Sequence, residues 1–237
     1  MLRTPGWART WTVLRLAMAV LLLVTIAWQA ATTVSAAVAN GWDMTTVLTN
    51  FFSYFTILSN LLAAVALAWA AGWAWARGRR AASEPAGLAL ALACATTFMI
   101  VTGVVYNALL RGLPLPGDPW TNEVLHVVGP LFLLLDLFLA PRRRRLGWST
   151  LVVIAALPVV WAVYTLVRGP LISAPATGSP PWYPYPFLNP ANFANGYGGV
   201  AVYIAIIAVV IVAVGAGVVA VGRRRGAAAS VVTAPAS

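Results

Sequence analysis

Six apolar stretches divide this 237-residue chain, and each is long enough to cross a lipid bilayer. They cover about residues 13–39, 51–76, 86–110, 123–140, 148–168 and 197–221. The hydrocarbon core of a bilayer is about 30 Å thick, so a helix that crosses it needs roughly 20 apolar residues. Only 8% of the residues are charged, against roughly 25% in a soluble domain. The sequence therefore predicts an all-α fold, a polytopic membrane helical bundle with six transmembrane helices.

The arginine residues predict how these helices are oriented. All fifteen Lys or Arg positions are arginine, and thirteen lie before or early in the first span, between the second and third, after the fourth or after the sixth. Only Arg111 and Arg168 lie on the other side. Because short cytoplasmic loops carry the excess of arginine, both termini are expected to be cytoplasmic. Anionic membrane lipids are the expected counter-charge for the net charge of +10, and no nucleic acid is expected as a partner.

The first apolar stretch has two interpretations. It follows basic residues and is followed by "VSAAVAN", as in a signal peptide that ends at a small-residue cleavage site. Cleavage would leave five spans and place the new N-terminus outside. The stretch is longer than a usual signal core, and an even number of spans suits the arginine pattern. These two points favour a retained helix.

The spans leave no room for a soluble domain. We expect residues 1–12 to form a cytoplasmic N-terminus, 13–222 the transmembrane domain and 223–237 a cytoplasmic tail. The longest connection, 169–196, is predicted to lie outside and contains seven prolines and several aromatic residues. Proline disfavours regular helix, and aromatic rings favour the membrane interface. This segment is either a plain connector or a lid over an outward-facing cavity.

The stretch "NFFSYFTILSN", residues 50–60, carries an unusual number of polar side chains for the start of a span. At 100° per residue, Thr49, Ser53, Thr56 and Asn60 fall within about 60° of one another on a continuous helix. The outer half of the second span is therefore expected to bear one polar stripe. Helix packing alone also explains such a stripe, because hydroxyl and small residues line helix interfaces in lipid.

A second polar group begins the fourth span, in "TNEVLHVVGP". It contains the only histidine, His126, with Asn122 and Glu123 on the same general face. Pro130 cannot donate to the carbonyl of His126 and is expected to kink the helix. An ionisable residue inside a span is a candidate for function. The alternative is a structural histidine that is bonded to a neighbouring hydroxyl.

The polar groups of the second and fourth spans are expected to lie at a similar depth in the membrane. Thr56 lies about 8 Å and His126 about 5 Å from the outer ends of their spans, at 1.5 Å per residue. The other polar residues expected in this layer are Ser53, Asn60, Tyr106, Asn107, Glu123, Tyr164 and Arg168. In the inner halves the chief polar residue is Asp136, which is expected to form a snorkelling ion pair with Arg142–Arg145.

The residue types in this layer suit ester hydrolysis. A hydroxyl becomes a nucleophile when a base such as histidine removes its proton. Glu123 can orient the imidazole, and Asn60 or Asn107 can stabilise an oxyanion. One histidine and scattered carboxylates make no metal-ligand set, so no metal and no cofactor are expected.

Four motifs resemble the bacterial Pr6Pr family of membrane proteins, over roughly residues 45–220. They are "NFFSYFTILSN", "VTGVVYNALLRG", "NEVLHVVGPLFLLLD" and "YPYPFLNPANFANGYGG". That family is distantly similar to the androgen-induced and androgen-dependent TFPI-regulating proteins, which are membrane threonine hydrolases of fatty acid esters of hydroxy fatty acids. The resemblance implies Thr56 as the nucleophile, His126 as its partner and a lipid-like ester as the substrate. It also implies a location in a bacterial inner or cell membrane.

Three functions remain open on the sequence. The first is an intramembrane threonine esterase that acts from the outer leaflet. The second is a lipid-binding or scaffold protein without catalysis, in which the polar layer holds the helices together. The third is a transporter with a relay of His126, Glu123 and Asp136, which predicts polar residues on both sides of the midplane and paired interrupted helices. The nearly apolar inner halves disfavour the transporter.

Overall fold

The computed structural model of the chain describes residues 4–77, 83–113 and 117–231, and in this part all regular secondary structure is helical. The main helices are α1 (Pro5–Asn40), α2 (Met44–Ser53), α3 (Phe55–Arg77), α4 (Ala86–Val105), α5 (Pro119–Glu123), α6 (Gly129–Leu139), α7 (Thr150–Arg168) and α8 (Tyr197–Val231). The short ones are the π-helical turns η1 (Tyr106–Leu110) and η2 (Val124–Val128) and the 3₁₀ turns η3 (Gly169–Leu171), η4 (Pro186–Leu188) and η5 (Pro190–Asn192). Within the described ranges, six helical segments are long and apolar enough to cross a membrane. The predicted all-α bundle of six spans is confirmed.

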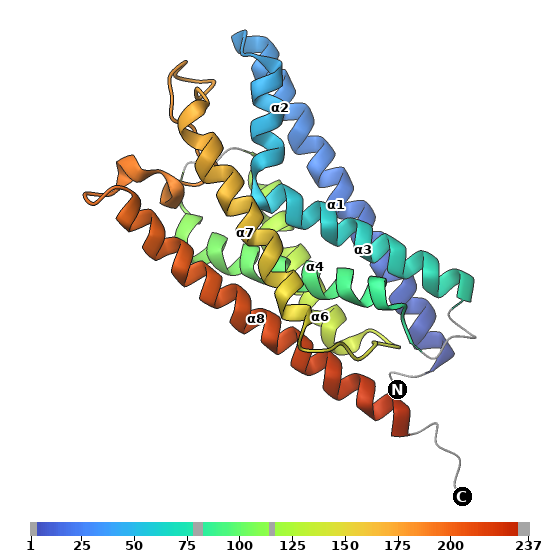
Figure 1. Cartoon of the computed structure of the whole chain (residues 1–237). Helices are drawn as coiled ribbons and strands as arrows, with labels where there is room; N and C mark the ends of the chain where they lie inside the picture. Colours follow the sequence, from blue (N-terminus) through green and yellow to red (C-terminus); the bar gives the residue numbers. More distant parts are fainter. Residues whose placement is uncertain (1–3, 78–82, 114–116, 232–237) are drawn as a thin grey trace, which may run out of the picture.

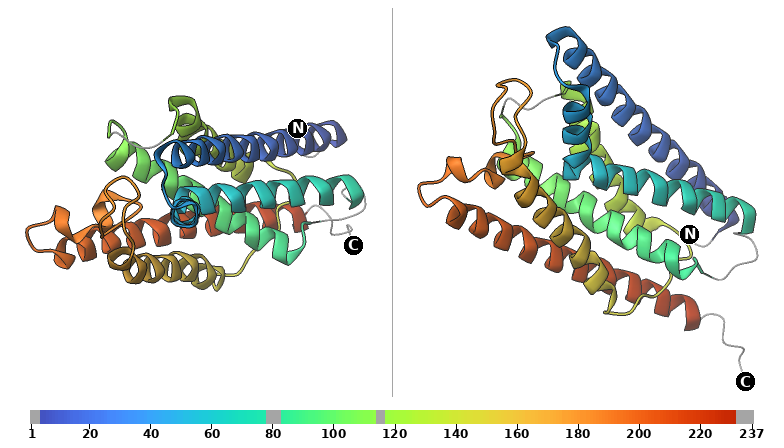
Figure 2. Two further views of the ribbon diagram at one scale, coloured as in Figure 1. Left: turned by 90° about the horizontal axis from the view of Figure 1, so that it is seen from above. Right: turned by 45° about the horizontal axis from the view of Figure 1, so that its top comes forward.

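Helix α4 lies at the centre of the bundle, between α3 on one side and α7 and α8 on the other (Figures 1 and 2). It also contacts α6, and α1 packs along α3. Buried residues lie on every side of α4, as the consecutive buried residues Ala93, Cys94, Ala95 and Thr96 show. A helix that is apolar all round is stable where it is surrounded by protein, which explains its central place.

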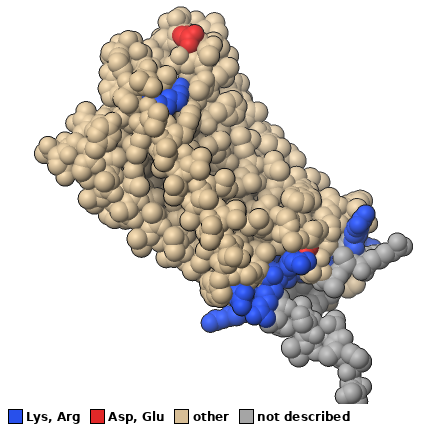
Figure 3. Space-filling model, viewed as in Figure 1, with Lys and Arg blue, Asp and Glu red and all other residues tan. Residues whose placement is uncertain are grey.

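The two ends of the bundle differ in charge. Helix α1 begins and α8 ends at the same end (Figure 1), and most basic side chains gather there (Figure 3). We call this the inner end and the opposite end, with Arg111 and Arg168, the outer end, after the orientation that the sequence predicts.

The second span, expected over about 51–76, begins at Phe55, because the helix breaks at Tyr54. This residue has extended backbone angles (φ −68°, ψ 125°) and separates α2 from α3, which run at an angle to each other (Figure 1). Its carbonyl accepts from the N–H groups of Ile57 and Leu58 and so begins α3. Its ring packs edge-on against Trp182 and Tyr185 of the 169–196 segment. These contacts favour the extended conformation over a weak local helix preference of aromatic and β-branched residues.

The expected kink at Pro130 is instead a widened turn. Helices α5 and α6 are joined by η2, in which Gly129 N–H donates to the carbonyl of Val124 five residues earlier. Pro130 has no N–H. Its nitrogen therefore cannot donate to the carbonyl of His126, four residues earlier, or to that of Leu125, five residues earlier, and side chains of other helices donate to both carbonyls.

The 169–196 segment folds back over the outer end of the bundle. Tyr185, Phe187 and Leu188 are buried and form an apolar cluster with Tyr106 of η1 and Val200 of α8. The segment is therefore part of the packed structure and forms a wall of the cavity described below.

Two expected boundaries differ from the helix ends. Helix α1 begins at Pro5 rather than near 13, since Thr4 accepts a hydrogen bond from Trp7 N–H and proline suits the first helical position. Helix α8 runs on to Val231, past the boundary expected at 222. Residues 1–3 and 232–237 of the expected terminal segments lie outside the described residues.

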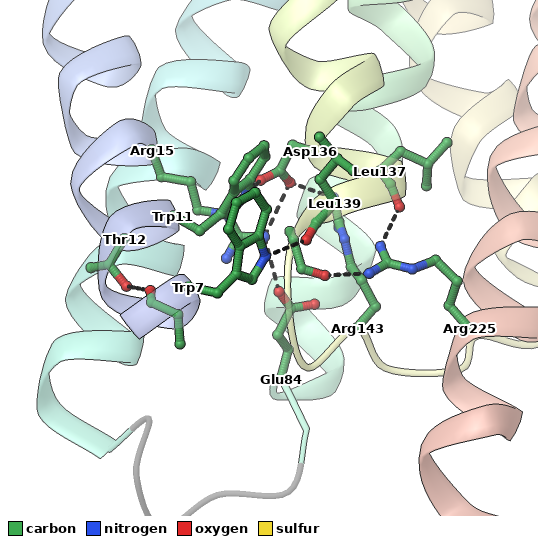
Figure 4. A network of polar contacts seen from close by, with 12 residues as sticks. Trp7, Trp11, Thr12, Arg15, Glu84, Asp136, Leu137, Leu139, Arg143 and Arg225 are labelled. Atoms are coloured by element: carbon green, nitrogen blue, oxygen red, sulfur yellow. Dashed lines mark hydrogen bonds and ion pairs between the residues drawn. The ribbon is translucent and has the colours of Figure 1, made fainter. Parts of the chain in front are cut away.

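The expected ion pair of Asp136 with the 142–145 arginines is present, with Arg143, but it is buried in a larger ionic network and does not snorkel (Figure 4). Asp136 of α6 is fully buried and binds Arg143 and, at 2.7 and 3.0 Å, Arg15 of α1. Arg15 also reaches Glu84 at 3.2 Å, and Trp11 N–H donates to Asp136. Snorkelling is not needed here, because α1 brings a second arginine to the carboxylate inside the bundle.

Candidate active site

Thr56 and His126 are in contact near the outer end. Thr56 is the second residue of α3, and His126 lies in the π-helical turn η2. Thr56 Oγ1 is 3.2 Å from His126 Nε2, and both residues are buried. The prediction that these two side chains share one layer of the bundle is confirmed by this contact.

The hydrogen bonds of the imidazole determine which nitrogen faces the threonine as an acceptor. His126 Nδ1 lies 2.9 Å from the carbonyl oxygen of Asn122. A carbonyl can only accept, so a neutral imidazole carries its proton on Nδ1. Nε2 then presents its lone pair to the Thr56 hydroxyl. The ring of Tyr106 stacks on the imidazole with centroids 3.9 Å apart and holds its plane.

Glu123 does not orient the imidazole, contrary to the expectation from sequence. Its carboxylate binds Arg111 with two hydrogen bonds of 2.7 and 3.1 Å, and both side chains are exposed. The Asn122 carbonyl takes the orienting position, because it lies one helical turn before His126. Charge pairing with Arg111 at the outer surface draws Glu123 away.

Tyr185 is a member of the site that sequence reasoning missed. Its hydroxyl lies 3.1 Å from Thr56 Oγ1 and accepts a 3.1 Å hydrogen bond from Thr56 N–H. Burial raises the pKa of the Tyr185 phenol, so it stays protonated and keeps a proton to donate. The motif "YPYPFLNP", which contains Tyr185, was the sequence signal that could have pointed to this residue. Its contact with Thr56 joins residues 129 positions apart, which the sequence alone does not predict.

Asn60 and Asn107 do not offer free donors to an oxyanion. The Asn60 amide donates to the carbonyls of Thr56 (2.8 Å) and Leu125 (3.2 Å). The Asn107 amide donates to the carbonyls of Gly103 (2.8 Å) and His126 (3.5 Å). Their amide hydrogens donate to backbone carbonyls, and two of these, of Leu125 and His126, are carbonyls to which Pro130 cannot donate.

Ser53, Tyr164 and Arg168 form a separate cluster. Ser53 ends α2 and its hydroxyl lies 2.9 Å from the Tyr164 hydroxyl. Together with Trp182 and Thr165 these residues line a small cleft that does not include Thr56 or His126. The expected single layer is therefore divided into two sites, because the break at Tyr54 turns α2 away from α3.

An apolar cavity of about 140 Å³ opens beside the Thr56–His126 pair. Its walls come from α4, α7, α8 and the 169–196 segment, with Val105, Pro158, Ile204 and Phe187 among the lining residues. Helices α7 and α8 pack closely farther inward, where Gly215 faces Ile154. The lining residues Val159 of α7 and Val212 of α8 are 58% and 47% exposed, so the wall that these two helices form is also part of the apolar surface of the bundle.

The fold and this site define the class of the protein. Six apolar helices, with a buried polar pair at one end of an apolar cavity, make it a polytopic integral membrane protein. Among the described residues, no three His, Cys, Asp or Glu side chains gather closely enough to hold a metal ion. Comparisons with models of protein families, with curated proteins and with solved structures found no match.

Proposed function

We propose that the protein is a threonine hydrolase of the plasma membrane that cleaves lipid-like esters, such as fatty acid esters of hydroxy fatty acids, from the outer leaflet. One observation carries the proposal. The hydroxyl of Thr56 lies 3.2 Å from His126 Nε2, the ring nitrogen that carries no proton in the neutral imidazole, at the wall of an apolar cavity. The resemblance to membrane threonine hydrolases supports the same pair of residues.

In the first step Thr56 Oγ1 attacks the ester carbonyl while its proton passes to His126 Nε2. The carbonyl π electrons move to oxygen, and the resulting oxyanion lies beside the Tyr185 hydroxyl, which is 3.1 Å from Thr56 Oγ1. Collapse of this intermediate breaks the bond to the alcohol oxygen. His126 returns the proton to that oxygen, the alcohol leaves, and the acyl group stays on Thr56.

In the second step water replaces the alcohol. His126 takes a proton from water, and the hydroxide oxygen attacks the acyl carbon to give a second tetrahedral intermediate. Collapse of this intermediate breaks the bond between the acyl carbon and Thr56 Oγ1, which takes the proton back from His126, and the free acid leaves. The shallow position of the pair supports this step, since water reaches the outer interface while the acyl chain occupies the apolar cavity. Access to water and an apolar cavity for the acyl chain are thus both available at the outer end of α3. His126 is the only histidine of the chain, so a second hydroxyl–histidine pair of this kind does not exist elsewhere.

A second candidate function is lipid binding without catalysis. The lining of the cavity favours it, since nearly all of its residues are apolar and the polar atoms of Thr56, His126 and Tyr185 bond to one another. A transporter is less well supported. The polar pair and the inner network are separated by the apolar core around Leu92 and Leu133, so the described residues provide no continuous relay.

Covalent labelling separates hydrolysis from lipid binding. A lipophilic fluorophosphonate should label the purified protein on Thr56, because the phosphorus centre mimics the ester carbonyl at the attacking oxygen. Thr56→Ala and His126→Ala should abolish labelling and ester hydrolysis, whereas Thr56→Ser should retain both. Labelling is followed by intact mass and turnover by release of free fatty acid.

The matched control is Thr49→Ala, which removes a hydroxyl that is exposed and bonded only to the carbonyl of Thr45. This variant should label as the wild type does, and the thermal midpoint of each variant shows whether it is folded. Absence of labelling in the wild type, or equal labelling of Thr56→Ala, contradicts the hydrolase and supports the lipid-binding function.

A further inference from the structure

Two π-helical turns face each other at the outer end of the bundle. Turn η1 follows α4 and turn η2 joins α5 to α6, and the Tyr106 ring of η1 stacks on the His126 imidazole of η2. The Asn107 amide of η1 also donates to the His126 carbonyl at 3.5 Å. Turns of this kind are rare and often occur at functional sites. The contacts that join these two turns therefore bear on how the imidazole is held.

Arg111 directly follows η1 and joins the two turns through its guanidinium. Nε donates to Asn107 Oδ1 at 2.7 Å, and the two terminal nitrogens donate to the two carboxylate oxygens of Glu123 at 2.7 and 3.1 Å. Glu123 directly precedes η2. The guanidinium carbon lies over the Tyr106 ring, 5.3 Å from its centre. All three guanidinium nitrogens and one face of the group thus contact residues in the two turns or next to them.

These contacts give two paths from Arg111 to His126. In the first, the guanidinium lies on one side of Tyr106, whose ring stacks on the imidazole at 3.9 Å with 17° between the planes. In the second, Asn107 links the guanidinium to the backbone carbonyl of His126. A guanidinium bound to both oxygens of a carboxylate has one defined orientation. The pair with Glu123 therefore fixes the guanidinium from which both paths begin.

The orientation of the imidazole decides whether Nε2 faces Thr56. Nδ1 is held by the Asn122 carbonyl at one point, and the Tyr106 ring holds the plane. Nε2 then lies 3.2 Å from Thr56 Oγ1. If Tyr106 moved, the ring could rotate about its bond to Cβ and carry Nε2 away from the hydroxyl. A group that fixes Tyr106 from its other side therefore also fixes this contact.

The charge of the Arg111–Glu123 pair suits this task. A lone guanidinium would oppose the positive charge that an imidazole acquires as a base, and a lone carboxylate would favour a permanently charged ring. The pair has no net charge and has neither effect in full. Its side chains are 44% and 47% exposed, and an exposed ion pair contributes little to folding. Its geometry, which is bidentate and stacked on an aromatic ring, serves orientation better than stability.

We propose that Arg111 is a positioning residue of the site. With Glu123 as its anchor, it holds Tyr106 and turn η2 so that His126 Nε2 stays at Thr56 Oγ1, and it contacts none of the reacting atoms itself. Its effect on turnover rests on the proposed hydrolase. Its effect on the imidazole does not, so the two can be tested separately.

Nuclear magnetic resonance of the imidazole tests the orientation directly. His126 is the only histidine, so the full chain with isotope-labelled histidine gives the signals of one ring. A stacked aromatic ring shifts the imidazole C–H protons upfield, and one neutral tautomer gives two well-separated nitrogen signals. Tyr106→Leu removes the stacked ring and gives the reference spectrum for its loss. Arg111→Gln should move the protons toward that reference and bring the two nitrogen signals closer together.

Kinetics test the consequence for hydrolysis. Arg111→Gln should lower kcat and the rate of fluorophosphonate labelling about tenfold or more, because a small displacement of a reacting group costs this much. KM should change little, because Arg111 is not among the residues that line the cavity. Arg111→Lys keeps the charge but loses the fork and the flat face, so it should restore neither the spectrum nor kcat.

Two further variants complete the test. Glu123→Gln removes the anchor but keeps the guanidinium, so it should shift the imidazole signals and lower kcat in the same direction. It carries the test if the thermal midpoint shows that Arg111→Gln does not fold. Arg168→Gln is the matched control, because it removes the same charge from the outer end while its guanidinium binds Asn50 of α2. It should leave the spectrum and kcat unchanged.

Four outcomes overturn the proposal. They are an unchanged imidazole spectrum in Arg111→Gln and Glu123→Gln, an altered spectrum with unchanged kcat, full rescue by Arg111→Lys, and equal effects of Arg168→Gln. Rescue by lysine would mean that charge alone suffices. If the wild type neither labels nor hydrolyses esters while Arg111→Gln alters the imidazole as expected, the hydrolase fails and the orienting role of Arg111 stands.

Discussion

At the residue scale, two carbonyls one helical turn before Pro130, those of Leu125 and His126, explain why asparagines lie in the outer polar layer. Inside a bilayer no water is present to bond a free carbonyl, so another part of the protein must supply the donor. Asn60 from α3 supplies it to Leu125, and Asn107 from η1 supplies it to His126. The asparagines thus hold the histidine turn in place and leave the reacting atoms to Thr56, His126 and Tyr185.

A double-mutant cycle tests this account of Asn60. Asn60→Leu should lower the free energy of unfolding by about 1–3 kcal/mol, because the buried carbonyl of Leu125 loses its donor. In a Pro130→Ala background the regained N–H can serve one of the freed carbonyls, so the same change should cost less. Denaturation in detergent gives the four stabilities.

Thr25→Val is the control for the loss of a buried polar atom in general, since the Thr25 hydroxyl serves only the carbonyl of Leu21 in its own helix. A cost of Asn60→Leu that is the same with and without Pro130 would contradict the role of the asparagine as a substitute donor.

At the scale of elements, the site depends on how closely α4 approaches the histidine turn. A Cβ added at Gly103 would lie 3.0 Å from the His126 carbonyl oxygen and 3.1 Å from Pro130 Cβ. The missing side chain therefore lets η2 pack directly on α4 and brings Tyr106, three residues later, over the imidazole. Helix packing in membranes uses small residues in this way.

Gly103→Ala should therefore destabilise the protein by about 1–3 kcal/mol, because the contact becomes overpacked. It should also reduce any hydrolysis, since η2 must shift away from α4. Thermal unfolding and ester turnover measure the two effects. Gly72→Ala is the matched control within a helix. Gly72 has open space where its Cβ would lie, so alanine there should be neutral or stabilise by roughly 1 kcal/mol. Equal effects at both glycines would show that helix propensity, not close packing, governs Gly103.

At the scale of the whole molecule, the inner network ties the first helix to the rest of the bundle. Arg15 of α1, Glu84 before α4, Asp136 of α6 and Arg143 after α6 are all buried (Figure 4). Arg225 of α8 adds hydrogen bonds to the carbonyls at the end of α6. Two positive and two negative charges thus lie together in the bundle, where burying any one of them alone would cost a large amount of free energy.

Asp136→Asn should lower the free energy of unfolding by about 3–5 kcal/mol, because it leaves two buried guanidinium groups without their shared carboxylate. Glu123→Gln removes a carboxylate from an exposed pair with Arg111 and should have a far smaller effect. Unfolding of both variants in the same detergent provides the comparison. A small effect at Asp136 would mean that water reaches the network.

The sequence by itself determined the six spans and the depth of the polar residues. Each span follows from its own length and hydropathy, because lipid acts on every segment separately, and the depth of Thr56 and His126 follows from counting along their segments. Their contact was predictable for that reason. The tertiary structure alone decided which polar groups pair. The break at Tyr54, the position of Tyr185, the use of Asn60 by Leu125 and the pairing of Arg15 with Asp136 all depend on segments that meet from far along the chain. A polar side chain in lipid must find a partner, but its own sequence neighbourhood does not state which of several partners the packing will bring to it.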